Sequence, residues 1–476
     1  MKVHLHTFGC KANQYDTERI RQEVEARGAE AVDGWGVADV CVVNTCTVTN
    51  QADAQARRLV RRVHRENPGA RVVVVGCSAA LNAPDYRAMD GVASVVEGHD
   101  PLRVAGAILP VPPASARVHD PSTQSKHMAA GRESSGGLVQ LELRAALDRV
   151  DTEPVGAELL QRRAGATRGW LKIQDGCDRK CSFCATRLAR GGSRSRPPAE
   201  IVAEARALAE RHPELVLTGI HIGHYGRDLD DDGRPRAPGA RRIRGDAWSL
   251  SRLLARLLDE IPDVRFRLGS VEATEIDDLL LELLATSGGR VAPHLHMPLQ
   301  SGADQVLRAM RRWHTREQYR ARAVEIAGRM PRLGLGADVI TGFPGETEED
   351  HASTRALVEE LPFTYLHVFP FSPRNGTVAA ELVRRDPVPQ RVAGERSREL
   401  RELVRDKAVR YRRQRVGGFA EITLERERTV GLTGDYLRVD VRGAPAPSGS
   451  KRLHRGVLHR TGEDLYIDLS RQSHDG

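Results

Sequence analysis

The sequence predicts an α/β protein with an amino-terminal parallel-sheet domain, a central partial (β/α)6 barrel and a small carboxyl-terminal β-barrel. Three observations carry this prediction: strand and helix patterns alternate over residues 1–106, they alternate again over 170–372, and short strand-like runs follow residue 418. Strands that alternate with helices typically build parallel sheets, whereas closely spaced short strands build sandwiches or barrels. A chain of 476 residues is also too long for one compact core, so several domains are expected.

The amino-terminal part, residues 1–107, reads as a small parallel-sheet domain. The segments "VCVVNT" and "RVVVV" are continuous apolar runs, which is typical of strands covered on both faces. The segment "YDTERIRQEVEARG" has an acidic first turn and ends at glycine, as a helix does. We therefore expect strands over residues 2–8, 38–45 and 70–76, and helices over 15–28 and 50–69.

The central part, residues 166–415, contains six candidate strands separated by amphipathic helical patterns. Six such units suggest an open version of the eight-unit barrel. The candidate strands cover residues 170–174, 215–220, 265–271, 294–300, 336–343 and 364–371. The preceding segment, 108–165, is rich in Pro, Ser and Gly and reads as a linker, and 228–247 reads as a charged surface insertion.

An Arg- and Glu-rich helix over residues 388–415 leads into the last domain, residues 416–472. Four short strand-like runs are expected there, over 419–426, 435–441, 456–461 and 464–469. A β-domain of this length is in the size range of small barrels that hold RNA.

Charge and hydropathy narrow the class of partner. The net charge of +8 suits a polyanion such as RNA, although a solvated Arg-rich surface would give the same value. No segment reaches the roughly 18 apolar residues of a membrane helix. The first residues, "MKVHLHTFGC", read as a strand and not as a signal peptide, so we expect a cytoplasmic protein with no membrane partner.

Seven cysteines are too few and too irregularly spaced for a disulfide framework, which points to metal binding or chemistry. Cys177, Cys181 and Cys184, here called the loop triad, have the spacing C-x3-C-x2-C directly after a predicted strand. Three thiolates on one loop suit a [4Fe–4S] cluster with one iron left for another ligand. A zinc site and a ferredoxin-like carrier are the alternatives, but zinc usually wants a fourth ligand and ferredoxins use another spacing.

Three more cysteines each lie just past the carboxyl end of a predicted strand: Cys10, Cys46 and Cys77, here called the dispersed triad. In an open parallel sheet those ends share one edge, so we expect these thiols to converge on a second cluster. Cys41 lies inside an apolar run, where a small thiol packs as a core residue.

The segments "FGCKANQYDTE", "VVNTCTVTNQAD", "VVVVGCSA" and "KIQDGCDRKCSFC" together resemble the radical S-adenosylmethionine (SAM) methylthiotransferases. The stretches "LTGIHIGHYG", "LHMPLQSGADQVLRAMRR" and "DVITGFPGETEEDH" extend the resemblance over nearly the whole chain. It implies an auxiliary-cluster domain, a radical SAM barrel and a carboxyl-terminal TRAM barrel. It also implies two [4Fe–4S] clusters and SAM as cofactors, with the six triad cysteines as metal ligands and the dispersed triad as the catalytic set.

The segment "GCKANQYDTE" is similar to the branch that acts on N6-threonylcarbamoyladenosine beside the tRNA anticodon. The isopentenyladenosine branch and the ribosomal-protein branch typically read differently after Gly-Cys, and both stay as alternatives. An iron–sulfur electron carrier without a substrate is a further alternative. The resemblance implies the tRNA anticodon stem-loop and a flavodoxin- or ferredoxin-type electron donor as partners of a monomer, with the sulfur donor left open.

The resemblance also supplies candidates for SAM contacts at the predicted strand ends, where barrel active sites are built. These are Phe183, Thr218, Gly219, Ser270, Glu272 and Gln300. His294 and His296 face one side of a strand, and we expect structural hydrogen bonds from them in preference to metal ligation. One stretch departs from the family pattern: "ATRLARGGSRS" keeps Arg190-Gly191 and Arg194-Ser195 but lacks the usual proline after Cys184.

Overall fold

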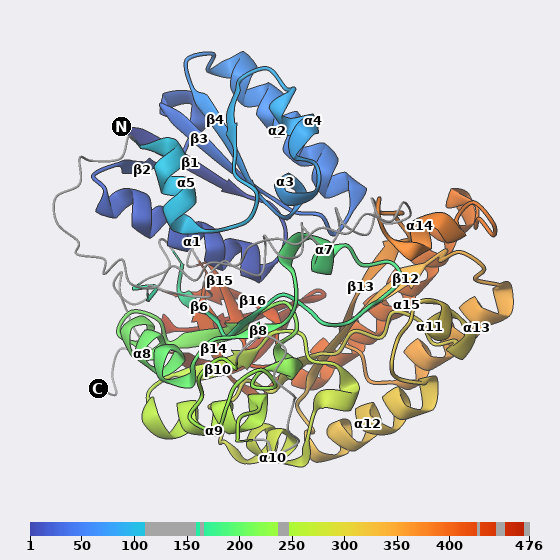
Figure 1. Ribbon diagram of the computed structural model, residues 1–476. Coiled ribbons are helices and arrows are strands. Elements are labelled where there is room, and N and C mark those ends of the chain that lie inside the picture. Colours follow the sequence, from blue (N-terminus) through green and yellow to red (C-terminus); the bar gives the residue numbers. More distant parts are fainter. Residues whose placement is uncertain (110–158, 162–165, 237–246, 426–428, 444–452, 471–476) are drawn as a thin grey trace. The chain divides into compact units, whose positions relative to one another are not determined.

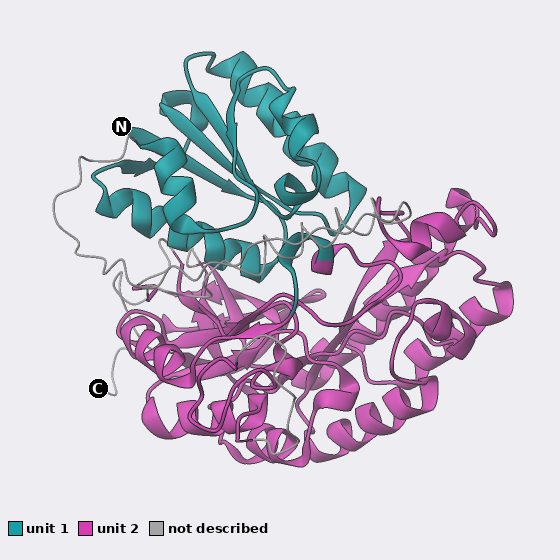
Figure 2. Cartoon of the chain, in the orientation of Figure 1, with its two compact units in different colours: residues 1–154, 188–192 teal, residues 155–187, 193–476 magenta. Residues whose placement is uncertain are grey.

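A computed structural model describes residues 1–109, 159–161, 166–236, 247–425, 429–443 and 453–470 (Figure 1). Of the expected linker, residues 108–165, only 108–109 and 159–161 lie within these ranges, and residues 237–246 of the expected insertion lie outside them. The described chain forms two compact units, residues 1–154 with 188–192, and residues 155–187 with 193–476 (Figure 2). Within the described ranges no helix combines the length and the apolar character that a membrane crossing needs.

The first unit is a five-stranded, fully parallel sheet with strand order β2-β1-β3-β4-β5. Its strands are β1 Lys2–Thr7, β2 Glu30–Val32, β3 Val40–Thr45, β4 Arg71–Gly76 and β5 Val92–Val95. Its helices are α1 Lys11–Ala26, α2 Asn50–Glu66, α3 Cys77–Leu81, α4 Ala83–Arg87 and α5 Pro101–Ile108, with a 3-10 turn η1 Trp35–Val37.

Helices cover both faces of this sheet, which is why its central strands are continuous apolar runs. Apolar residues of α1 and α5 pack with Val3, Val40 and Val73 on one face. Residues of α2 and α4 pack with Cys41 and Val43 on the other. With both faces covered, ligands of such a sheet are expected at the carboxyl ends of its parallel strands.

The second unit contains six parallel strands in two three-stranded sheets, β10-β9-β6 and β11-β12-β13. Parallel bridges from Phe266 to Val291 and from Ser270 to His296 continue the order from β10 to the second sheet. The strands are β6 Arg168–Lys172, β9 Glu214–Thr218, β10 Arg265–Leu268, β11 His294–His296, β12 Gly334–Thr341 and β13 Tyr365–Pro370. This open array confirms the partial (β/α)6 barrel.

Helices connect the strands of the array, two further helices follow its last strand, and one small hairpin follows its first strand. The helices are α7 Thr186–Arg190, α8 Pro198–Ala209, α9 Leu250–Glu260, α10 Asp278–Thr286, α11 Asp304–Ala309, α12 Arg316–Arg329, α13 Glu348–Glu360, α14 Val378–Leu382 and α15 Gln390–Arg415, with 3-10 turns η3 Ile222–His224 and η4 Ala273–Glu275. The hairpin pairs β7 Gln174–Asp175 with β8 Arg194–Ser195.

The carboxyl-terminal strands close into a five-stranded barrel of order β14-β15-β16-β18-β17, as the sequence predicts for the last domain. Its strands are β14 Phe419–Leu424, β15 Val430–Thr433, β16 Arg438–Arg442, β17 His454–Thr461 and β18 Asp464–Asp468. Its interior is apolar, with Ile422, Leu458 and Ile467 fully buried.

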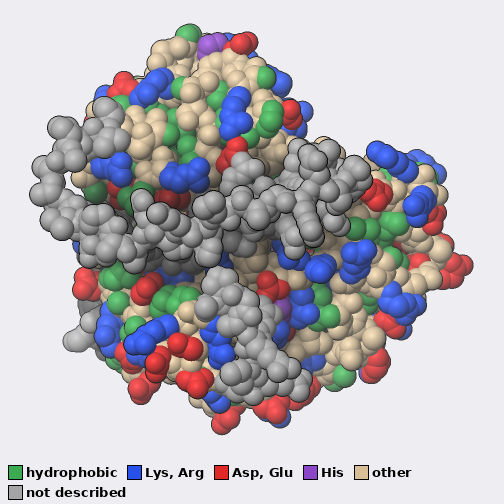
Figure 3. Space-filling view, viewed as in Figure 1, with side chains coloured by type: hydrophobic (Ala, Val, Ile, Leu, Met, Phe, Trp, Pro, Cys, Tyr) green, Lys and Arg blue, Asp and Glu red, His purple; other side chains and the backbone are tan. Residues whose placement is uncertain are grey.

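On the face of the molecule drawn in Figure 3, acidic and basic side chains are interspersed, so the net charge of +8 is not gathered in one patch there.

Several elements differ from the sequence-based expectations. The short strands β2, β5 and β15 were not expected, because three- and four-residue strands carry too little alternation to be distinguished from loops. Helix α1 begins at Lys11, four residues before the expected start. Its first turn lies against the sheet edge, and Ala12 and Asn13 are buried there, which makes the beginning of this helix part of the site.

Candidate active site: two cysteine triads

The dispersed triad lies at the carboxyl edge of the first unit's sheet. Strands β1, β3 and β4 are adjacent and parallel, and Cys10, Cys46 and Cys77 follow them within a few residues. Cys10 is the residue before helix α1, and Cys77 begins helix α3. Cys10 is exposed, whereas Cys46 and Cys77 are buried.

Neighbouring thiols of the dispersed triad influence the pKa of Cys46 and of Cys77, whereas that of Cys41 responds to burial alone. Burial raises the pKa of Cys77 to about 12, and the nearby thiols of Cys46 and Cys10 add to that rise while the Arg190 guanidinium opposes it. Burial likewise raises the pKa of Cys46 to about 11, with Cys10 contributing. For Cys41, burial alone raises the pKa to about 12. Cys41 packs in the core between the sheet and α2, as expected.

The backbone around the dispersed triad is held in a conformation that fits these thiols closely. Gly9 has a φ of +96°, and a Cβ atom there would lie 2.5 Å from the Sγ of Cys46. Only glycine adopts this conformation and leaves that space. The side chain of Asn13 donates to the carbonyls of Phe8 and Thr45, each at 2.9 Å, and so ties the two cysteine-bearing loops together.

The loop triad lies in the second unit, between the hairpin strand β7 and helix α7. The backbone N–H groups of Arg179 and Thr186 donate to the sulfurs of Cys177 and Cys184, each at 3.4 Å. Burial raises the pKa of Cys177 to about 12; the Arg179 amide lowers it, and the thiols of Cys184 and Cys181 raise it. The loop therefore supplies hydrogen bonds to sulfur, which stabilise thiolates and tune iron–sulfur sites.

The spacing of the donors argues against a single zinc ion in either triad. Thiolates on one tetrahedral zinc lie only about 4 Å apart, since each Zn–S bond is about 2.3 Å. Among the described residues, the groups of three ligand atoms within 4.8 Å of one another are His221 with His224 and Glu275, and His296 with Asp338 and His367. The three sulfurs of neither cysteine triad lie within 4.8 Å of one another, which fits ligands spread around a cluster better than ligands of one ion.

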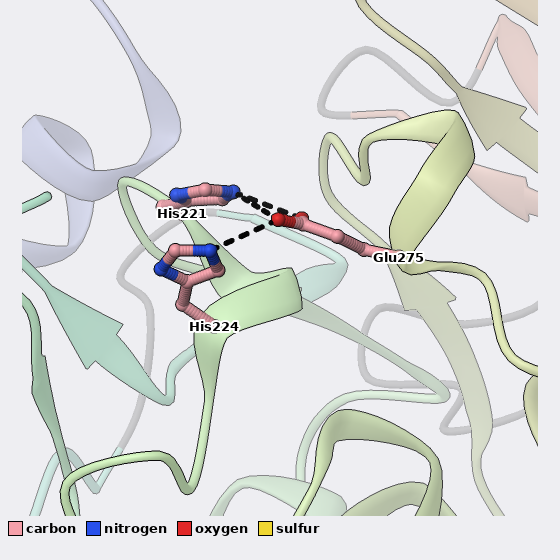
Figure 4. Close-up of side chains that lie close together, drawn as sticks. All are labelled: His221, His224 and Glu275. Atoms are coloured by element: carbon pink, nitrogen blue, oxygen red, sulfur yellow. Dashed lines mark hydrogen bonds and ion pairs between the residues drawn. The ribbon is translucent and has the colours of Figure 1, made fainter. Parts of the chain in front are cut away.

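Two polar networks reach the loop triad from the strand ends. In the first, Nδ1 of His221 lies 3.5 Å from Sγ of Cys177, and Nε2 lies 2.9 Å from both carboxylate oxygens of Glu275 (Figure 4). His224 stacks on the His221 ring and approaches the same carboxylate at 3.1 Å. Arg179 also pairs with it, at 3.0 Å. Burial opposes ionisation, but the bonds from both imidazoles prevail and hold the pKa of Glu275 well below its usual range.

In the second network, Arg312 bridges Cys181 and Glu272. Its NH1 lies 3.6 Å from the Cys181 sulfur, and its NH2 pairs with the Glu272 carboxylate. Both side chains of this ion pair are almost fully buried, so the pair is fixed in place. Burial raises the pKa of Glu272, while the guanidinium acts in the opposite direction.

The expected SAM-contact residues occupy the same edge of the barrel but differ in exposure. Thr218 ends β9 and is buried, Gly219 follows it, and Ser270 is exposed beyond β10. Gln300 is buried with a φ of 68°. Phe183 lies on the cysteine loop and packs against an apolar cluster that includes Met310 and Phe343. Of the six, Glu272 is the one that the described contacts connect to a cysteine, through Arg312.

Sequence reasoning did not single out Arg312, His221 and Glu275. The first two lie in stretches that carry the family resemblance, but their side chains meet the loop triad only through folding. Glu275 lies outside those stretches and gives no signal of its own. His294 and His296 lie 2.8 and 3.1 Å from the Tyr365 hydroxyl, and His296 is also one of the three side chains in the group with Asp338 and His367.

An open six-strand barrel with a C-x3-C-x2-C loop after its first strand defines a radical SAM enzyme. The model described as "Radical SAM superfamily" matches residues 171–358, and "Uncharacterized protein family UPF0004" matches residues 2–98. A Bacillus subtilis protein named threonylcarbamoyladenosine tRNA methylthiotransferase MtaB is 36% identical, over 98% of this chain and 96% of its own. The chain therefore belongs to the radical SAM methylthiotransferase family.

Two further relatives span most of the chain. The protein of the same name from Rickettsia prowazekii is 32% identical, over 92% of this chain and 91% of its own. A Bacillus licheniformis protein named tRNA-2-methylthio-N(6)-dimethylallyladenosine synthase is 30% identical, over 90% of this chain and 76% of its own. Membership implies SAM and an iron–sulfur cluster as cofactors.

Proposed function

We propose that this enzyme adds a methylthio group to C2 of N6-threonylcarbamoyladenosine next to the tRNA anticodon. The observation that carries the proposal is the match, along almost all of both chains, to a relative named for that activity. The segment "GCKANQ" around Cys10 supports the same branch.

The residues of both triads fit two [4Fe–4S] clusters. On this proposal the loop triad holds the cluster that binds SAM, and the dispersed triad holds an auxiliary cluster. When bound, these groups supply one-electron and radical chemistry, which is needed because the C2–H bond of adenine is not acidic enough for base catalysis. We assign the SAM contacts to Phe183, Thr218, Gly219, Ser270, Glu272 and Gln300.

The chain's own groups hold and shield these sites. Arg179 and Thr186 donate backbone N–H groups to the loop sulfurs, and Arg312 fixes Glu272 at the strand ends. Asn13 and Gly9 hold the loops of the dispersed triad in register. The enzyme in this proposal is a cytoplasmic monomer that takes the anticodon stem-loop and an electron from a flavodoxin- or ferredoxin-type protein.

The proposal is tested by mass spectrometry of tRNA nucleosides from a strain that lacks the gene. Loss of the 2-methylthio form of N6-threonylcarbamoyladenosine, restored by the gene, is the expected result. Loss of the 2-methylthio isopentenyl nucleoside, or of a methylthio group on a ribosomal protein, would assign the enzyme to another branch. Iron analysis of the anaerobically reconstituted protein should give about eight irons per chain, and about four would refute the second cluster.

A further inference from the structure

Arg190 is a fully buried cation that contacts a cysteine of the dispersed triad. It ends helix α7, shortly after the loop triad in sequence, yet residues 188–192 group with the first unit. Its side chain is 1% exposed, and its Nε lies 3.2 Å from the Sγ of Cys77. A guanidinium has donors and no acceptors, so Nε–H donates to the sulfur.

One terminal nitrogen of Arg190 is surrounded by three side chains of the same unit. NH2 lies 2.6 Å from Oδ1 of Asn13, 2.7 Å from Oδ2 of Asp16 and 3.0 Å from Nε2 of His99. Asp16 is also buried, so the ion pair is shielded from solvent and from salt. The guanidinium therefore has one orientation, with its Nε–H directed at the Cys77 sulfur.

To hold a cluster the dispersed triad must carry thiolates, and Arg190 places a positive charge beside them. Cys46 and Cys77 are buried, and a buried thiolate is costly unless a positive charge lies near it. The Arg190 guanidinium supplies such a charge, in contact with the Cys77 sulfur. Arginine is always protonated in proteins, so its charge is a permanent feature of the site.

We propose that Arg190 is a positioning residue of the auxiliary cluster, which holds the Cys77 ligand through an N–H···S bond and offsets the cluster's negative charge. The inference rests on the proposed function, because it requires that the dispersed triad holds a cluster. Hydrogen bonds to sulfur and nearby charge both set the reduction potential of iron–sulfur clusters. Arg190 should therefore make the auxiliary cluster easier to reduce.

The test isolates the auxiliary cluster in the full-length chain. Cys177, Cys181 and Cys184 are replaced with Ala, and Arg190→Gln, Arg190→Lys or Asp16→Asn is added to this background. The matched control is Arg196→Gln, because Arg196 is an equally buried arginine that pairs with Glu204 at 3.0 Å in the second unit. Iron content, thermal melting and the midpoint potential from an EPR-monitored redox titration are measured for each form.

The expected result is a lower midpoint potential in Arg190→Gln, a smaller shift in Arg190→Lys and Asp16→Asn, and no shift in Arg196→Gln. Loss of iron from Arg190→Gln with normal melting also supports the proposal. If Arg190→Gln does not fold, the potentials of Arg190→Lys and Asp16→Asn decide, and potentials equal to the parent would overturn it. A parent that binds no iron would refute the auxiliary cluster, and with it both the two-cluster part of the proposed function and the role given to Arg190, whereas a parent that binds iron but shows unshifted potentials in the variants would refute the role of Arg190 alone.

Discussion

His221 lies between Cys177 and Glu275, with one ring nitrogen 3.5 Å from the sulfur and the other 2.9 Å from the carboxylate. A carboxylate bound to one ring nitrogen of a histidine fixes the orientation of the ring, as around metal sites, and here the other nitrogen faces the sulfur of Cys177. His224 shares the carboxylate but has no contact with Cys177 among those found in the described chain. Substitutions of the two histidines therefore distinguish an effect on Cys177 from an effect on Glu275.

The first prediction compares substitutions of these two histidines. His221→Asn should reduce SAM cleavage, and iron retention by the loop triad under a chelator, by about 10-fold, because loss of an outer-shell partner typically costs 10- to 100-fold. His224→Asn should change both by much less, since it leaves the contact with Cys177 intact. The 5′-deoxyadenosine yield and the iron content check this. Equal losses in the two variants would mean that Glu275, and not the contact with sulfur, is what matters.

The second prediction separates Cys46 from Cys41, which lie five residues apart. Cys46→Ala should abolish methylthiolation and spare SAM cleavage, because the cluster proposed for Cys46 lies in another unit than the loop triad. Cys41→Ala should keep both activities and lower the free energy of unfolding by about 1 kcal/mol through a small cavity. Product analysis and denaturant unfolding check this, and the reverse ranking would remove Cys46 from the site.

The third prediction concerns the loop triad. Cys181→Ala should lose about half of the iron and all SAM cleavage, while the fold is retained, because one of the two proposed clusters has lost a ligand. Iron analysis, 5′-deoxyadenosine assay and circular dichroism measure these three effects. Production of 5′-deoxyadenosine at the parent rate would contradict the assignment of this loop to SAM.

The sequence was sufficient for the features that depend on strand order. Cys10, Cys46 and Cys77 each follow a predicted strand, and parallel strands bring such positions to one edge, so their convergence was predictable. The contacts of Arg190 with Cys77 and of Arg312 with Cys181 were not, because they join residues 113 and 131 positions apart. Such contacts depend on loop path and side-chain packing, which have no periodic signal.

The fourth prediction concerns the outer face of the carboxyl-terminal barrel, where RNA binding is expected. Arg442 lies 3.6 Å over the ring of Tyr466, and His459 stacks on the same ring with centroids 5.1 Å apart. An aromatic ring beside a cation suits stacking on RNA bases together with a phosphate contact. Arg442→Ala with Tyr466→Ala should weaken tRNA binding by roughly 10-fold and lower the salt slope by about 1.

The control for this face is Arg206→Ala, which removes one positive charge from another position, on α8. The side chain of Arg206 is 61% exposed. Binding is measured at several salt concentrations, with iron content and SAM cleavage followed in parallel. An equal affinity and salt slope for the double variant and the parent would remove this face from the RNA-binding account. Point substitutions test this face more specifically than deletion of the barrel, because deletion would also expose buried arginines of the second unit.

The fifth prediction concerns those arginines and the pH dependence of stability. Glu214 on β9 accepts from Arg265 at 2.6 Å and from Arg267 at 2.8 Å, and all three are buried. Arg267 also donates to the carbonyls of Thr433 and Gly434 in the five-stranded barrel, each at 2.9 Å. Burial opposes ionisation of Glu214, but the two guanidinium groups prevail and lower its pKa from 4.5 to about 2.

Since the folded pKa of Glu214 is depressed, its contribution to stability is full above about pH 4.5 and is lost as the pH falls toward 2. Glu214→Gln should lower the free energy of unfolding at pH 7 by roughly 3–5 kcal/mol, because it leaves two buried guanidinium groups without a counter-charge. The difference between parent and variant should shrink as the pH falls through this window. Denaturant unfolding at several pH values measures it, and a difference that stays constant from pH 7 to 3 would show that the Glu214 carboxylate is not what stabilises this junction.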